Sequence, residues 1–380
     1  MFVFGWRTAI LALVSVQVLL LAAALLRTPR NRSANRILAG LLIVLIGMIT
    51  PYTMGFAGFY DAFPWLTFAP FAAPLAIGPL VLAYARAWAG EPLRPGLALH
   101  LTPAAVHLAY GLVCFSLPPD AKQAWANGTD GALIAPLVST LSPLSLAVYT
   151  WAAFRTLRRY QTQLGEVVTD EARYAGLWLQ RALVALLPIV VAWAAYQAWE
   201  LTSGGLDYFQ RLHLYLAMAA LALYLAIEGR RHADLRRPSF GAPPARNPGP
   251  ARDWRAQAAE WTARIDAAAR WRDPDLTLAD LAARLGTNTH YLSRALNEGL
   301  DMNFARFING RRAQAVADAL AAGSDSPLLD LALDAGFNSK ASFNRAYRAT
   351  FGESPSAARR RHASNPESLD PHAVLRRAES

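Results

Sequence analysis

The chain has 380 residues, of which 54% are hydrophobic and only 17% charged, and its formal net charge is +10. This composition is too apolar for an ordinary soluble protein. The single cysteine, Cys114, excludes an intrachain disulfide bond and a metal site built from several cysteines. Residues 230–380 hold 23 Lys/Arg and 17 Asp/Glu, against 14 and 10 in the longer stretch 1–229. The chain is therefore expected to contain at least two domains, with the first in lipid.

Seven apolar windows of about the 20 residues that a spanning helix needs occur in the first domain. They cover residues 8–26, 37–60, 63–85, 97–117, 132–154, 177–199 and 212–227. Pro70, Pro74 and Pro79 make the third window the least regular. A cleaved signal peptide at residues 1–26 is the alternative for the first window, but the stronger arginine cluster follows the apolar run rather than preceding it. We predict a seven-helix transmembrane bundle at residues 1–229.

The distribution of Lys and Arg between the loops predicts the orientation of this bundle, because basic loops stay in the cytoplasm. Loops one, three and five and the tail after the last window hold 14 Lys/Arg, whereas the opposite side holds Arg7, Lys122 and Arg211. The N-terminus is therefore expected outside a bacterial inner membrane and the C-terminus in the cytoplasm.

Residues 230–252 are basic and rich in Pro and Gly, and we interpret them as a linker. Residues 362–380 are expected to be a disordered tail. Between them, the domain at 253–361 opens with Trp254, Ala258, Trp261, Ile265 and Ala268 at helical spacing. This amphipathic helix is expected to pack on its own domain, and the alternative is a seam between the two subunits of a homodimer.

A first helix-turn-helix pattern follows. Thr277 is a plausible N-cap, Leu281 and Leu285 form an apolar face, and Gly286 can take the left-handed conformation that ends the helix. Asn288 or Thr287 then caps a second helix. The outward residues of that helix are His290, Ser293, Arg294 and Asn297.

The pattern is repeated about 50 residues later. Gly286 to Gly336 and Ala282 to Ala332 are both steps of 50, and Asn338 or Ser339 caps the second helix of the repeat. Its outward residues are Lys340, Ala341, Asn344, Arg345 and Arg348. A helix of about 19 residues, 304–322, connects the two units, so one chain could place two helices in successive major grooves. The predicted fold is all-α, with the membrane bundle followed by a cytoplasmic tandem helix-turn-helix domain.

These residues match a known family at its own spacing. The match comprises Leu331-Ala332, Gly336-Phe337, Ser342-Phe343-Asn344-Arg345, Tyr347-Arg348, Gly352 and Ser354-Pro355, together with Asp273-Pro274, Leu281-Ala282 and Tyr291-Leu292-Ser293-Arg294 upstream. The stretch 261–359 resembles the DNA-binding domain of AraC/XylS-type transcriptional regulators. The whole chain is similar to a membrane-anchored branch in which a multi-span region replaces the usual sensor. Gly310-Arg311 and Ala341 depart from the family pattern.

The resemblance implies that both recognition helices contact the major groove. Base reading is assigned to His290, Ser293, Lys340 and Asn344, and phosphate contact to Arg294, Arg345 and Arg348. Asn297 and Ser339 complete the candidate DNA-binding set. Two alternatives stay open, since Arg294 and Arg345 could instead form ion pairs within the domain and Ser339 is better explained as a cap than as a reader.

The ten acids of residues 1–229 all fall in loops or at the ends of windows, which argues against a pump or an intramembrane protease. Polar residues within the windows are candidates for a ligand cavity or for hydrogen bonds between helices. They are Gln17, His100, His107 and Gln197. No catalytic, metal or cofactor-binding motif is identified.

The sequence therefore predicts a membrane-bound, one-component transcription regulator rather than an enzyme. Its expected partners are double-stranded DNA, inner-membrane lipid, RNA polymerase and an unidentified small-molecule or lipid-phase signal. The alternative is a transporter-like or channel-like membrane protein whose helix-turn-helix domain docks another protein.

Overall fold

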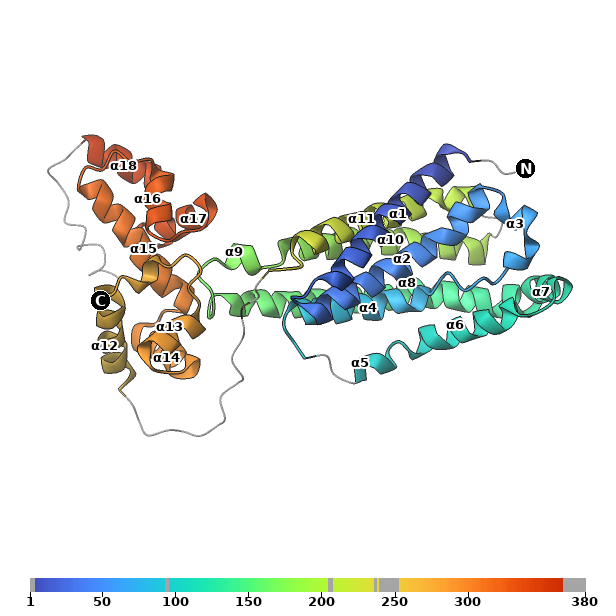
Figure 1. Ribbon diagram of the computed structural model, residues 1–380, viewed down its shortest axis with the longest axis horizontal. Helices are drawn as coiled ribbons and strands as arrows, with labels where there is room; N and C mark the ends of the chain where they lie inside the picture. Colours follow the sequence, from blue (N-terminus) through green and yellow to red (C-terminus); the bar gives the residue numbers. More distant parts are fainter. Residues whose placement is uncertain (1–3, 93–95, 204–207, 236–237, 239–252, 365–380) are drawn as a thin grey trace. The chain divides into compact units, whose positions relative to one another are not determined.

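The structure is a computed structural model that describes residues 4–92, 96–203, 208–235, 238 and 253–364 (Figure 1). Most of the predicted linker, at 239–252, and the tail beyond residue 364 lie outside the described residues. The described residues form helices and no strand, apart from an isolated antiparallel bridge between Val168 and Thr277. The expected all-α fold is confirmed.

The chain divides into two compact units. Unit 1 contains residues 1–159 and 176–236, and unit 2 contains residues 160–175 and 237–380. Residues 160–175 belong in sequence to the loop between two predicted membrane windows, yet they fold with the C-terminal helices. The hydropathy of the chain does not indicate that this loop folds with the C-terminal helices.

Unit 1 is built from long apolar helices joined by short turns. Its helices are α1 (Trp6–Arg27), α2 (Arg32–Phe56), α3 (Phe59–Ala62), η1 (Pro64–Leu66), α4 (Pro74–Trp88), α5 (Gly96–Leu99), α6 (Thr102–Phe115), α7 (Pro119–Trp125), the π-helix η2 (Ala126–Ile134), α8 (Ala135–Leu164), α10 (Leu177–Thr202), η3 (Tyr208–Arg211) and α11 (Leu212–Arg231). The last residues of α8, from Tyr160, fall in unit 2.

Helices α1, α2 and α11 pack against one another, and α10 packs on α11, as their parallel courses in Figure 1 show. Gly229 lies where α11 meets α2, and a Cβ at this position would collide with the side chain of Leu38. Small residues allow such close approach between helices in lipid. At one end of the bundle, the Asn31 side chain donates hydrogen bonds of 2.9 Å to the carbonyls of Ala233 and Leu235, which ties the α1–α2 turn to the end of α11.

Among the described residues, five helical segments are long and apolar enough to cross a membrane. They are Trp6–Arg27, Arg32–Phe56, Pro119–Leu164, Leu177–Thr202 and Phe209–Arg231. The third predicted window is instead divided where Pro64 and Pro74 begin new helices, and the fourth is divided where α6 begins at Thr102 with Pro103 in its first turn. An apolar anchor is therefore present, whereas the count of seven crossings stays a prediction.

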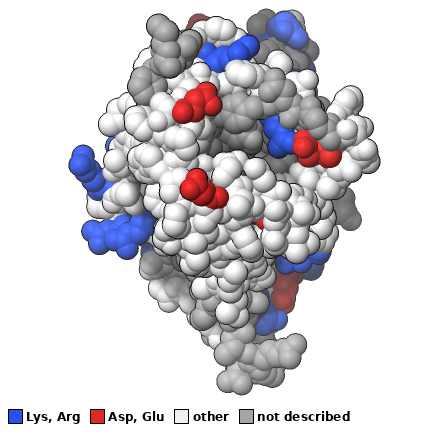
Figure 2. Space-filling view, turned by 90° about the vertical axis from the view of Figure 1, so that its right-hand side faces the viewer, with Lys and Arg blue, Asp and Glu red and all other residues white. Residues whose placement is uncertain are grey.

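The outer surface of unit 1 carries large apolar side chains that an aqueous surface would not hold in such numbers. Examples on three different helices are Leu13, Leu20, Leu144, Val148, Leu187 and Val191. Figure 2 shows a largely uncharged surface in the view toward the α3 and α7 end, with isolated acidic and basic side chains. These exposed side chains are suited to contact lipid.

Unit 2 contains shorter helices. They are α9 (Glu171–Tyr174), α12 (Trp254–Ala267), η4 (Arg270–Arg272), α13 (Leu278–Leu285), α14 (Thr289–Arg294), the π-helix η5 (Ala295–Gly299), α15 (Phe304–Ala321), α16 (Leu328–Asp334), α17 (Lys340–Phe351) and α18 (Pro355–Ser364). Helix α12 buries Ala258, Trp261 and Ile265 and packs on η5, which confirms the expected packing on its own domain.

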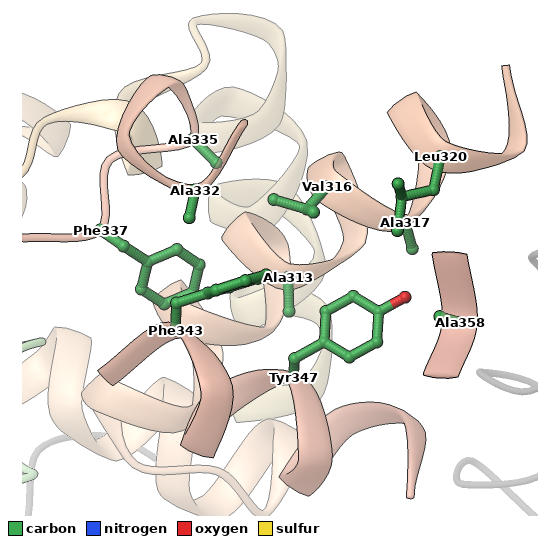
Figure 3. Packing of buried hydrophobic residues seen from close by; sticks show 10 residues of the cluster. All are labelled: Ala313, Val316, Ala317, Leu320, Ala332, Ala335, Phe337, Phe343, Tyr347 and Ala358. Atoms are coloured by element: carbon green, nitrogen blue, oxygen red, sulfur yellow. The ribbon is translucent and has the colours of Figure 1, made fainter. Parts of the chain in front are cut away.

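The C-terminal half of unit 2 has a compact aromatic core, seen in Figure 3. Phe337, Phe343 and Tyr347 contact one another ring to ring, and Val316 and Leu320 of α15 complete the cluster. Burial raises the pKa of the Tyr347 hydroxyl to about 12, so this side chain stays neutral at physiological pH. The core fixes which face of α17 points inward.

Candidate nucleic-acid interface

The first helix pair, α13 and α14, is bounded by the residues that the sequence analysis assigned to its ends. The Thr277 side chain accepts a hydrogen bond from the Asp280 backbone N–H, and the Asp280 carboxylate accepts one from the Thr277 N–H, forming a capping box. Gly286 ends α13 with a φ of +75°, and Asn288 caps α14 by accepting from the Tyr291 N–H at 2.9 Å. Leu292, Ala295 and Leu296 are buried.

The second helix pair, α16 and α17, repeats this arrangement. Gly336 has a φ of +94°, and Ser339 caps α17 by accepting from the Ser342 N–H at 3.2 Å. Asn338, the other candidate cap, instead donates to the carbonyl of Pro274 at 2.7 Å. The alternative in which Ser339 acts as a cap is therefore supported by the geometry.

Residues 271–274 link the two helix pairs. A Cβ on Gly336 would collide with the Arg272 carbonyl, so only glycine permits this approach. The neighbouring Asp273 carboxylate binds Arg284 of α13 at 2.7 Å. One short segment thus contacts the turn of the second pair and the end of the first.

The side chain of Arg312, on α15, also binds the segment 271–274. Its side chain is only 1% exposed and donates to the carbonyls of Trp271 and Asp273 at 2.7 Å and to the Asn309 Oδ1 at 3.3 Å. Burial lowers the pKa of Arg312 to about 10, which still leaves the group charged at neutral pH. Sequence reasoning missed this residue, although its position between the inward residues Ile308 and Val316 was a usable signal.

The candidate readers of the first pair lie on one surface of α14 and η5. His290, Ser293 and Arg294 are partly exposed and Asn297 is exposed. Arg294 forms a two-point ion pair with Glu298, at 2.7 and 3.0 Å, and stacks over Trp254. Its hydrogen bonds to the carboxylate lower the pKa of Glu298. The alternative role of Arg294 as an intradomain ion pair is thus the one that this structure displays.

The candidate readers of the second pair carry a basic surface without ion pairs to other described residues. Lys340, Arg345 and Arg348 are exposed, Asn344 is partly exposed, and none of the three cations forms an ion pair with another described residue. Helix α17 therefore offers positive charge to a polyanion without first breaking a salt bridge.

The departure from the family pattern at Gly310-Arg311 is accommodated in α15. Gly310 has open space around it, and Arg311 pairs with Asp266 of α12 at 3.4 Å while stacking over Phe307. An arginine in place of an apolar residue is satisfied here by a partner on the neighbouring helix. Neither Gly310 nor Arg311 interrupts α15.

The four polar residues considered for a ligand cavity in unit 1 do not gather in one place. His107 lines a cavity of about 310 Å³ with Tyr110, Asp130 and Arg211. His100 instead contacts the Tyr149 hydroxyl at 2.5 Å. Gln197 is buried and Gln17 is exposed, and neither lines this cavity.

Comparison with protein families gives a match to a helix-turn-helix domain over residues 281–361, which begins within α13 and covers α14, α15 and the second helix pair. Comparisons with curated proteins and with solved structures give no match. The matched residues contain the caps Asn288 and Ser339, the two turn glycines and the outward basic side chains described above. Residues 281–361 form an AraC-type helix-turn-helix domain, the DNA-binding domain of a transcription regulator, in a chain whose N-terminal helices are apolar enough to span a membrane.

Proposed function

We propose that this protein is a membrane-bound, one-component regulator that binds specific DNA sequences through both helix pairs and acts with RNA polymerase as its partner. The observation that carries the proposal is the pair of capped helices α14 and α17, which a shared segment and the buried Arg312 hold in a fixed frame. Helix α15, with 18 residues at 1.5 Å each, is about 27 Å long. That length suits two helices that enter grooves one turn, about 34 Å, apart.

Selection from a random DNA library tests this proposal with the full-length protein in lipid nanodiscs. We expect an enriched site with two parts about one turn apart and an affinity that falls steeply with salt. No enriched sequence, together with an affinity that does not depend on salt, would favour the alternative in which the domain docks a protein.

We also propose that the N-terminus lies outside the membrane and unit 2 in the cytoplasm. Residues 160–175 share unit 2 with helices α12 to α18, and the chain passes through two candidate spans, α10 and α11, between them. Two crossings return the chain to the same side, which supports the orientation derived from the arginine distribution. A reporter active only in the periplasm should work when fused near Asn127 and fail near Gln161 or after Glu228; activity after Glu228 would contradict both the orientation and DNA binding.

The cavity around His107 is our proposed site for the signal, because it combines a volume of about 310 Å³ with polar side chains in the apolar unit. His107→Phe should fill part of the cavity and change transcription from the genes that the selected DNA site identifies. Gln17→Leu, on the exposed face of α1, is the control. Equal transcription in both variants and the wild type would contradict this assignment.

A further inference from the structure

Residues Tyr160–Ala175, which we call the strap, bind to the starts of two helices in the DNA-binding domain. The Gly165 carbonyl accepts a hydrogen bond from the Ala305 N–H at 2.9 Å, and the Val167 carbonyl accepts one from the Leu278 N–H at 3.0 Å. Leu278 and Ala305 lie in the first turns of α13 and α15, whose amides have no partner within their own helix. The strap therefore satisfies backbone donors that water or an anion would otherwise occupy.

Side chains add to these backbone contacts. The Asn309 amide donates to the Thr169 carbonyl at 2.8 Å, and Arg173 of the strap pairs with Asp275 at 2.7 Å. Val167 and Val168 are buried, unlike the exposed Thr162 and Gln163 just before them. The strap is thus a packed part of unit 2 rather than a loose connection.

The strap also reaches two residues of the candidate DNA-binding set. The Glu166 carboxylate accepts a hydrogen bond from the Asn297 amide at 3.0 Å. Glu171 lines the same cavity, of about 660 Å³, as Arg345 of α17. Burial raises the pKa of Glu171 and the charge of Arg345 opposes this effect, so the two groups interact. Glu166 thus binds a residue of the first helix pair, and Glu171 shares a cavity with Arg345 of the second pair without forming an ion pair with it.

We propose that the strap competes with DNA for the two helix pairs, so that tight DNA binding requires the strap to leave Asn297 and Arg345. The inference rests on the proposed DNA-binding function. The chain enters the strap from α8 and leaves it at Gly176, where a Cβ would lie 2.6 Å from the Trp88 Nε1 in unit 1. Because both ends continue into membrane helices, a rearrangement of those helices would pull on the strap directly.

Glycine substitution separates the strap from the domain without changing charge. A Cβ at Gly165 would lie 2.9 Å from the Nδ2 of Asn303, the residue that caps α15, so the larger side chain of Gly165→Leu should push Asn303 aside and loosen the strap at the start of α15. The matched control is Ala263→Leu, since Ala263 is exposed on α12 and does not line the cavity shared by Glu171 and Arg345. If the strap is docked in nine of ten molecules, the full-length protein should bind its selected DNA site about tenfold more tightly after displacement.

A second variant keeps the proposal testable if Gly165→Leu fails to fold. Glu166→Gln with Glu171→Gln neutralises the strap acids, and Glu260→Gln with Asp325→Asn removes the same charge from exposed positions elsewhere in unit 2. Only the strap variant should tighten DNA binding, by about threefold or more. Equal tightening in both would reveal a general charge effect and overturn the proposal, as would unchanged affinity in the strap variant.

Hydrogen exchange in the full-length protein supplies a direct readout of displacement. Saturating DNA should speed exchange of the strap peptide 160–175, whereas unchanged or slower exchange would show that the strap stays docked and would overturn the proposal. Failure of the strap variants while the wild type binds its site contradicts only the strap. Absence of specific binding by the wild type and every variant contradicts the proposed function itself.

Discussion

The two helix pairs of unit 2 share a 50-residue step, a turn glycine and an N-cap, yet their surroundings differ. In the first pair, Gly286 has open space around it and Arg294 is held by Glu298. In the second pair, Gly336 abuts the Arg272 carbonyl, and the cations of α17 have no ion-pair partner among the described residues. The repeat thus determines the local fold, whereas distant contacts give each pair a different role.

The largest expected effect comes from removing the side chain of Arg312, which binds the segment that contacts both helix pairs. Arg312→Ala leaves the partly buried carbonyls of Trp271 and Asp273 without their donor and should destabilise unit 2 by about 2 to 5 kcal/mol. Hydrogen exchange of the α15 amides in the full-length protein measures this change. Arg306→Ala, an exposed position on the same helix, is the control. Equal exchange in the two variants would mean that Arg312 does not stabilise the contact between the two helix pairs.

The turn glycines give a matched comparison between the pairs. Gly286→Ala should cost only the left-handed backbone strain, roughly 1 to 2 kcal/mol. Gly336→Ala adds a collision with the Arg272 carbonyl and should cost at least about 1 kcal/mol more. Hydrogen exchange of α13 and α16 checks the difference. Equal costs would refute the close approach in the second pair.

Substitutions of DNA-contacting residues should also have different effects in the two helix pairs. Arg348→Ala should weaken binding to all sequences and reduce the salt slope by about one, whereas Asn344→Ala should relax discrimination at one base by about 1 to 3 kcal/mol. Arg294→Ala should change the salt slope less, because Arg294 already binds Glu298. Binding isotherms over a range of salt concentrations test this order, and an Arg294 effect equal to that of Arg348 would contradict it.

The smallest expected effects are at the caps. Thr277→Ala and Ser339→Ala should each cost about 1 kcal/mol of helix stability. Ser339→Asn should keep the cap of α17 and the DNA specificity. If Ser339→Asn preserves stability but changes the preferred base sequence, Ser339 is a reader as well as a cap.

The features that the sequence predicted are those determined by neighbours in the chain. The turn glycines, the caps Thr277 and Asn288, and the buried faces of α14 and α17 all follow from spacing within a few residues. Contacts between segments far apart in the chain could not be predicted, because they produce no periodic pattern in the sequence. The strap meets α13 more than 100 residues later in the chain, and Arg312 satisfies carbonyls about 40 residues earlier.

The structure of the membrane region could likewise be predicted only in part. Mean hydropathy identified all the apolar stretches, but it does not register where a proline ends one helix and begins another. The third window therefore resolves into shorter helices that begin at Pro64 and Pro74, and in the fourth window α6 begins at Thr102 with Pro103 in its first turn. The placement of His107, apart from His100, Gln17 and Gln197, likewise depends on how the helices pack.

The central claim is that both helix pairs read DNA, and a footprint of the full-length protein on its selected site tests it most directly. The account predicts two protected patches about one helical turn apart. His290→Ala should alter contacts in one patch only and Asn344→Ala in the other only. A single protected patch, or two substitutions that alter the same patch, would contradict the claim.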